Sequence, residues 1–148
     1  MIRSILSVIA AYIAMAITMF LTFTVFYLVL GADGAFKSGV YDVSIRWMIG
    51  SVVLGFLSVV VGGYVAVLLS KDRSTALWFG AIVLALSLLV GCLAYQKGNP
   101  HEVRAGNVPN IEAMNHAQNP TWFNFLIPFT GFVGALWGGK LRKDRRRY

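Results

Sequence analysis

The fold is decided by residues 47–69, WMIGSVVLGFLSVVVGGYVAVLL, an apolar run without a charged side chain. A bilayer core about 30 Å thick is crossed by roughly 20 apolar residues in a helix. Uninterrupted apolar stretches of this length are typical of transmembrane helices. We therefore expect residues 47–69 to form a membrane-spanning helix.

Three other stretches repeat this pattern, at residues 4–30, 76–95 and 121–139. The last one follows Asn119-Pro120, a pair typical of a helix start. It is also the least apolar, because several glycines and Pro128 dilute its large aliphatic and aromatic residues. We expect four transmembrane helices, with the fourth inserting with help from the other three.

The composition excludes an ordinary soluble domain. Soluble domains are roughly 45–50% apolar and about 25% charged, whereas this chain of 148 residues is 57% hydrophobic and 13% charged. Four apolar stretches leave too few polar residues to cover a soluble core. The sequence predicts an all-α integral membrane protein, with residues 1–148 forming a single membrane domain.

The positive charge is unevenly distributed between the two sides of these spans. Nine basic and two acidic residues lie before the first span, between the second and third, and in residues 140–148. Four basic and four acidic residues lie in the loops 31–46 and 96–120. Because basic residues favour cytoplasmic loops, we expect both termini in the cytoplasm and both loops outside. The net charge of +7 therefore indicates topology rather than nucleic-acid binding.

The basic residues directly after the last span form a predicted contact with anionic lipids. Each basic residue near an anionic membrane surface contributes about 1 kcal/mol. The residues expected to contact headgroups are Arg142, Lys143, Arg145, Arg146 and Arg147.

Small residues recur at helical spacing in the second and fourth spans. Membrane helices approach closely where small residues face one another. We expect helix contacts, within the chain or to a partner, at Ser51, Gly55, Gly62, Gly131, Gly134 and Gly138. Aromatic residues near the span ends predict a belt at the membrane surface: Tyr27, Trp47, Trp78, Tyr95 and Trp122.

The outer loop 96–120 holds the candidate chemistry. Residues 110–117 predict a short helix on which Glu112 and His116 share a face, and His101 lies nearby in the sequence. A metal bound by these three residues is one interpretation, but the spacing is not that of a zinc protease and a fourth ligand is missing. We favour a surface helix with one Glu–His pair, and we expect neither a metal nor another cofactor.

Catalytic residues are missing from the apolar spans. They hold no Asp, Glu, Lys, Arg or His at mid-membrane depth, which argues against a pump, a proton-coupled transporter or a voltage sensor. Cys92 is the only cysteine, so dithiol redox chemistry within the chain is excluded. We therefore expect no enzymatic activity.

Three sequence segments carry a family resemblance: Val61-Gly-Gly-Tyr64, Asn110-Ile-Glu-Ala-Met114 and the glycine-rich last span. They resemble a loose group of small four-span bacterial inner-membrane proteins with no assigned activity. The resemblance implies a bacterial inner membrane and no functional residue.

The sequence favours a non-catalytic accessory or scaffolding subunit, bound to other membrane subunits or to itself. One alternative is a small channel or transporter for a neutral solute. The second is a membrane enzyme that uses the His and Glu residues of the outer loop.

Overall fold

The computed structural model describes residues 2–98 and 101–142, which form five helices and no strand. The helices are α1 (Ile2–Ala35), α2 (Ile45–Ser70), α3 (Ser74–Lys97), α4 (Asn110–His116) and α5 (Thr121–Leu141). The short α4 lies in the connection between α3 and α5, as the sequence predicts.

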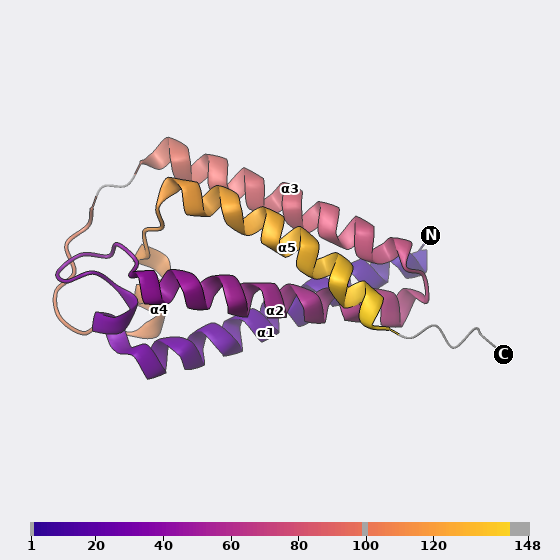
Figure 1. Ribbon diagram of the computed structural model, residues 1–148, viewed down its shortest axis with the longest axis horizontal. Coiled ribbons are helices and arrows are strands. Elements are labelled where there is room, and N and C mark those ends of the chain that lie inside the picture. The colour runs from indigo at the N-terminus through magenta and orange to yellow at the C-terminus, as the bar shows by residue number, and fades with distance from the viewer. Residues whose placement is uncertain (1, 99–100, 143–148) are drawn as a thin grey trace.

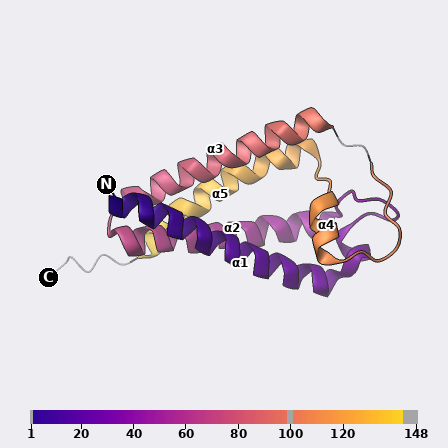
Figure 2. The ribbon, with the colours of Figure 1, turned by 180° about the vertical axis from the view of Figure 1, so that it is seen from behind.

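The four long helices form two packed pairs (Figure 1). α1 packs along α2, and α3 packs along α5, while α2 and α5 join the two pairs. The pairs converge at the end where α1 begins and α5 finishes, which we call the terminal end. They diverge toward the opposite end, where α4 lies (Figure 2).

Three helices of the described chain, α1, α2 and α3, are long and apolar enough to cross a membrane. The expectation of four such helices is therefore corrected to three. α5 has 21 residues, but Asn124, Pro128, Thr130 and its glycines lower its hydropathy. Its buried residues face the other helices instead, because small side chains at Gly131, Ala135 and Gly138 allow close packing.

Particular residues explain where the regular α1 helix ends and where α2 begins. Gly31 adopts a φ of 66° and a ψ of 175°, a conformation that glycine tolerates far better than other residues, and it interrupts the regular α1 helix. α2 starts at a capping residue, because the Ser44 hydroxyl accepts a hydrogen bond from the Trp47 backbone N–H at 3.1 Å. The same hydroxyl donates to the Gly34 carbonyl at 2.6 Å and so fixes the two helix ends together.

Two apolar clusters stabilise the molecule. The first lies where α1, α2, α3 and α5 meet and consists of Ala11, Met15, Val59, Ala66, Phe79, Val83 and Ala135. The second lies at the diverging end, around Tyr27, Phe36, Tyr41, Val43 and Trp47. The second cluster joins the ends of α1 and α2 to the loops that follow them.

Candidate functional site

The loops at the diverging end fold into one unit, which we call the cap and define as residues 36–44 and 101–118. Backbone hydrogen bonds hold its two segments together. The Tyr41 N–H donates to Glu102 O at 3.0 Å, and the Gln118 N–H donates to Tyr41 O at 3.0 Å. The cap therefore connects the α1–α2 pair to the chain between α3 and α5.

A buried arginine anchors the cap to α1. The Arg104 side chain is 3% exposed, and its Nη2 lies 2.6 Å from Oδ1 of Asp33, whose own side chain is 90% exposed. The guanidinium also donates to the Gly106 carbonyl and lies 6.0 Å from the centre of the Phe36 ring. Sequence reasoning missed this residue, because the contacts join segments about 70 residues apart.

Tyr41 forms the centre of the polar network in the cap. Its hydroxyl donates a hydrogen bond to Glu112 Oε1 at 2.8 Å, and its ring packs against the His116 ring at a centroid distance of 5.1 Å. The hydrogen bond to Glu112 raises the pKa of Tyr41 above its usual value, and burial raises it further. Tyr41 thus remains a neutral donor to the Glu112 carboxylate.

The three candidate metal ligands lie in separate contacts. Nδ1 of His116 is 2.7 Å from Glu102 Oε2, and Nδ1 of His101 is 3.1 Å from Asp42. Glu112 contacts Tyr41 instead. No group of three ligating side chains that could hold a metal occurs in residues 2–98 and 101–142. The hydrogen-bond partners come from other loop segments, so the i, i+4 spacing of Glu112 and His116 did not reveal them.

Four of the predicted packing residues lie where α5 meets its neighbours or at the centre of the bundle. A methyl group added at Gly138 would collide with the Val60 carbonyl, and one added at Gly134 would lie 3.1 Å from Phe56 O. At Gly62 it would lie 2.6 Å from the Phe79 ring. At Gly131 the nearest atom is a Val83 methyl at 3.5 Å, an ordinary van der Waals contact.

The other two predicted packing residues, Gly55 and Ser51, have different surroundings. A methyl group at Gly55 would meet no atom within 4 Å. Ser51 is 6% exposed, and its hydroxyl has no hydrogen-bond partner in the described part of the chain. Sequence reasoning also missed Gly63, whose added methyl would collide with the Ala135 backbone.

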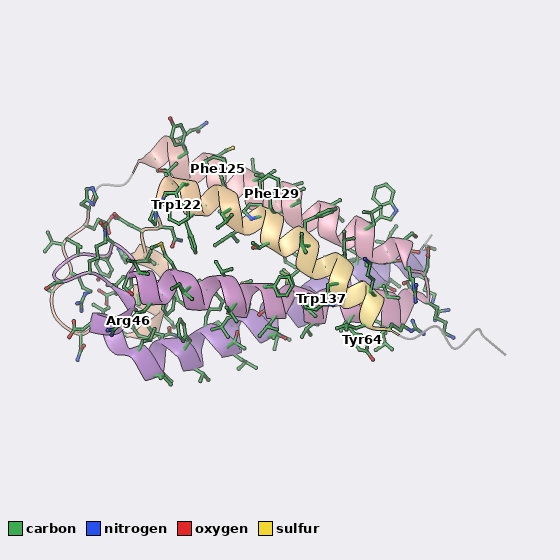
Figure 3. The ribbon with its side chains drawn as sticks, viewed as in Figure 1. Arg46, Tyr64, Trp122, Phe125, Phe129 and Trp137 are labelled. Atoms are coloured by element: carbon green, nitrogen blue, oxygen red, sulfur yellow. The ribbon has the colours of Figure 1, made fainter. Side chains whose placement is uncertain are left out.

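The aromatic residues divide into buried and exposed sets. Trp47 stacks on Phe26 at 5.2 Å and is 8% exposed, and Tyr27 is buried beside it. These two residues are therefore core residues, which corrects their predicted place in the belt. Trp78, Tyr95 and Trp122 are exposed. Figure 3 shows Trp122 on α5 at the diverging end and Trp137 near the crossing with α2.

The basic tail is described only at its first residues. Arg142 Nη1 donates to the carbonyls of Val67 and Leu68, the latter at 2.9 Å, and so contacts the C-terminal end of α2. Cations at this end of a helix are favoured by its dipole. Lys143, Arg145, Arg146 and Arg147 lie outside the described residues.

Two grooves open between the helices. The larger one, about 880 Å³, lies between α1 and α3 at the terminal end. The smaller one, about 420 Å³, lies between α2 and α5 where the pairs diverge and is lined by apolar residues such as Phe56 and Phe129. Both grooves face outward from the bundle, where the surrounding side chains are apolar and exposed.

Comparisons with family models, with curated proteins and with solved structures give no match to this chain. The class that the fold of residues 2–98 and 101–142 defines is an all-helical protein with three helices that are long and apolar enough to cross a membrane.

Proposed function

We propose that this protein is a non-catalytic membrane protein that serves as an accessory or scaffolding subunit of a larger bacterial inner-membrane complex. The exposure of α1 carries the proposal. In the most apolar window of α1 only 11% of the residues are buried, compared with 33% in α2 and 28% in α3. Membrane helices associate through close packing, so α1 has the most surface free for another subunit.

The side-chain contacts within the cap favour a binding role for the protein over an enzymatic role. His101, His116, Tyr41 and Arg104 each contact another side chain of the protein. These contacts join loop segments that are distant in the sequence, and so they stabilise the fold of the cap. A folded cap at one end of the bundle is a rigid surface on which a partner can dock.

The charge distribution supports an orientation with the terminal end in the cytoplasm and the cap outside. The terminal end carries the excess of basic residues, which favours the cytoplasmic side. Since α5 lies along α2 and α3, we infer that it crosses the membrane with them. Its packing contacts replace part of the hydropathy that it lacks.

Cross-linking from α1 in native membranes tests the subunit proposal. A photo-reactive amino acid at Ile17, which is 55% exposed, is compared with one at the buried Met15. We expect a defined protein to be cross-linked from Ile17, to be absent from the Met15 control, and to co-purify in stoichiometric amount in native lipid particles.

Three results would contradict the subunit proposal. Lipid adducts alone from Ile17 would show that no subunit covers α1. Solute flux through the purified protein in liposomes would support the channel instead. A metal-dependent activity that is lost on His116→Ala would support the enzyme.

Labelling of single cysteines tests the orientation separately. On a Cys92→Ser background, Asn107→Cys in the cap and Lys140→Cys at the terminal end are both exposed. We expect an impermeant thiol reagent to modify intact cells at residue 107 only, and both sites after permeabilisation. The reverse pattern would place the termini outside.

A further inference from the structure

The groove between α1 and α3 has the form of a site for an amphiphile. Its apolar walls are formed by Ile5, Ile9 and Ile13 of α1 and by Trp78, Ile82 and Leu86 of α3. Its end near the terminal end of the bundle is polar, because Ser4, Asp72, Ser74 and Thr75 line it there. A ligand for this groove therefore needs a long apolar part and a polar head.

The depth of the groove matches one leaflet of a bilayer. From Ser74 to Leu86 the groove follows twelve residue steps of α3, or about 18 Å at 1.5 Å per residue. One half of a hydrocarbon core about 30 Å thick measures about 15 Å. A transmembrane helix of a partner would need contacts across both leaflets, whereas a lipid acyl chain occupies one. The groove dimensions therefore favour a lipid over a helix.

The polar end holds a hydroxyl group in need of a partner. Thr75 is 1% exposed, and its hydroxyl has no hydrogen-bond partner among the described residues. A buried hydroxyl without a partner costs free energy. Because this hydroxyl is buried, a rotation of the side chain is needed to bring it to a headgroup oxygen in the groove that Thr75 lines.

The charges at the polar end are of both signs. The Asp72 carboxylate accepts hydrogen bonds from the backbone N–H and the hydroxyl of Ser74. These bonds lower the pKa of Asp72 below its usual value, so the carboxylate is ionised. Lys71 and Arg73 flank Asp72 in the sequence, and Arg3 precedes Ser4. A carboxylate among cations complements a headgroup that carries an ammonium beside a phosphate.

We propose that the α1–α3 groove binds one phospholipid whose headgroup carries a primary ammonium group. One acyl chain lies between the isoleucines of α1 and the apolar residues of α3. The ammonium donates to Asp72, whose carboxylate oxygens have lone pairs left beyond the bonds to Ser74. The phosphate lies near Arg3 and Arg73. The α1 wall of this lipid site ends at Ile13, so Ile17 lies one helical turn beyond it.

Native mass spectrometry of the purified protein with defined lipids tests the proposal. The probes are phosphatidylethanolamine, phosphatidylcholine and phosphatidylglycerol with identical palmitoyl and oleoyl chains. We expect one molecule of phosphatidylethanolamine to bind about tenfold more tightly than the other two, as a charge-assisted hydrogen bond implies. Phosphatidylcholine lacks the N–H donors, and phosphatidylglycerol lacks the ammonium.

Variants separate the headgroup contact from folding. Asp72→Asn removes the charge but keeps a side-chain oxygen that can accept the hydrogen bond from the Ser74 N–H. We expect this variant to lose the preference for phosphatidylethanolamine. Asp42→Asn, in the cap at the other end of the molecule, is the matched control and retains the preference. Ile82→Trp fills the groove and lowers the affinity for all three lipids.

Three outcomes overturn the proposal. The first is equal binding of the three lipids, and the second is tighter binding of phosphatidylglycerol. The third is a preference for phosphatidylethanolamine that persists in Asp72→Asn. Failure of the Ile17 cross-link alone leaves the lipid site standing, since the two sites are tested by different residues.

Discussion

Arg104 shows how one buried charge organises a loop. Its guanidinium contacts Asp33, Gly106 and the ring of Phe36, while its Nε has no partner among residues 2–98 and 101–142. A buried charge is stabilised only when it is paired and hydrogen-bonded. Asp33, by contrast, is almost fully exposed, so most of its interaction is screened by solvent.

This asymmetry predicts unequal effects of the two partners. Arg104→Met should destabilise the protein by about 1–3 kcal/mol, because it removes several contacts of a buried side chain. Asp33→Asn should cost about 1 kcal/mol or less, because that side of the pair is exposed. Thermal unfolding in mild detergent measures both. An equal loss of stability in the two variants would contradict the unequal contributions expected for Arg104 and Asp33.

From the raised pKa of Tyr41 we expect the stability of the folded protein to depend on pH in the alkaline range. Its pKa is raised in the folded protein by the bond to Glu112 and by burial. A group with a raised pKa contributes fully below its unfolded pKa and loses that contribution as the pH rises through the folded value. Stability should therefore fall as the pH increases from the usual tyrosine value of 10.0.

The matching control for this pH dependence is Tyr41→Phe. Unfolding is followed across the alkaline range in both proteins, and a difference titration of phenolate absorbance reports Tyr41 itself. We expect the variant to show a shallower loss of stability. Parallel curves for the two proteins would assign the alkaline effect to other groups.

At the scale of elements, the packing of α5 on its neighbours depends more on its glycines than on large apolar side chains. Its glycine-rich face packs on α2 and α3, and at Gly63 and Gly138 the neighbouring backbone leaves no room for a methyl group. Dispersion contacts accumulate where backbones approach closely. The glycines lower the hydropathy of α5, and the same glycines let it pack closely against α2 and α3.

A pair of alanine substitutions on α2 tests this account of α5. Gly63→Ala should destabilise the protein by about 1–3 kcal/mol, the usual cost of overpacking. Gly55→Ala, on the same helix, meets no atom within 4 Å and should be neutral or stabilising, because alanine favours the helix over glycine. Thermal unfolding in detergent compares the two. A larger loss at Gly55 would place the contact with α5 elsewhere.

The sequence predicts the helices well because apolar length is a local property. Residues 47–69 and 76–95 lie within α2 and α3, and the short helix at residues 110–116 forms as expected. The side of each helix that faces a neighbour is a tertiary property. Spacing alone therefore grouped Gly55 with Gly62, although only Gly62 has close neighbours.

The polar contacts of the cap could not be predicted for the same reason. The sequence displays Glu112 and His116 one helical turn apart, and it hides their true partners, Tyr41 and Glu102, in other segments. Tyr27 and Trp47 resemble interface residues by position along the chain. They are buried because the cap folds back over them.

At the scale of the whole molecule, Trp47 connects the bundle to the cap. Its ring contacts Phe23, Phe26 and Tyr27 of α1 while it occupies the first turn of α2. Aromatic pairs at these distances add to the free energy gained by burial. Loss of this side chain therefore affects α1, α2 and the cap together.

Trp47→Ala should be among the most destabilising single substitutions in the protein. Truncation of a buried tryptophan costs about 3–5 kcal/mol, whereas Trp122→Ala, at a side chain that is 60% exposed, should cost about 1 kcal/mol or less. Thermal unfolding gives the ranking, and limited proteolysis of the cap shows whether the loops open. A cap that stays protected in Trp47→Ala would show that its own hydrogen bonds suffice.

The divergence of the two helix pairs has a mechanical consequence. The pairs meet at one end, and the cap links them at the other (Figure 1). The two pairs and the cap therefore form the three sides of a triangle. In a triangle the length of the base sets the opposite angle. The hydrogen bonds between Tyr41, Glu102 and Gln118, which join the two segments of the cap, therefore oppose a change in the separation of the two pairs.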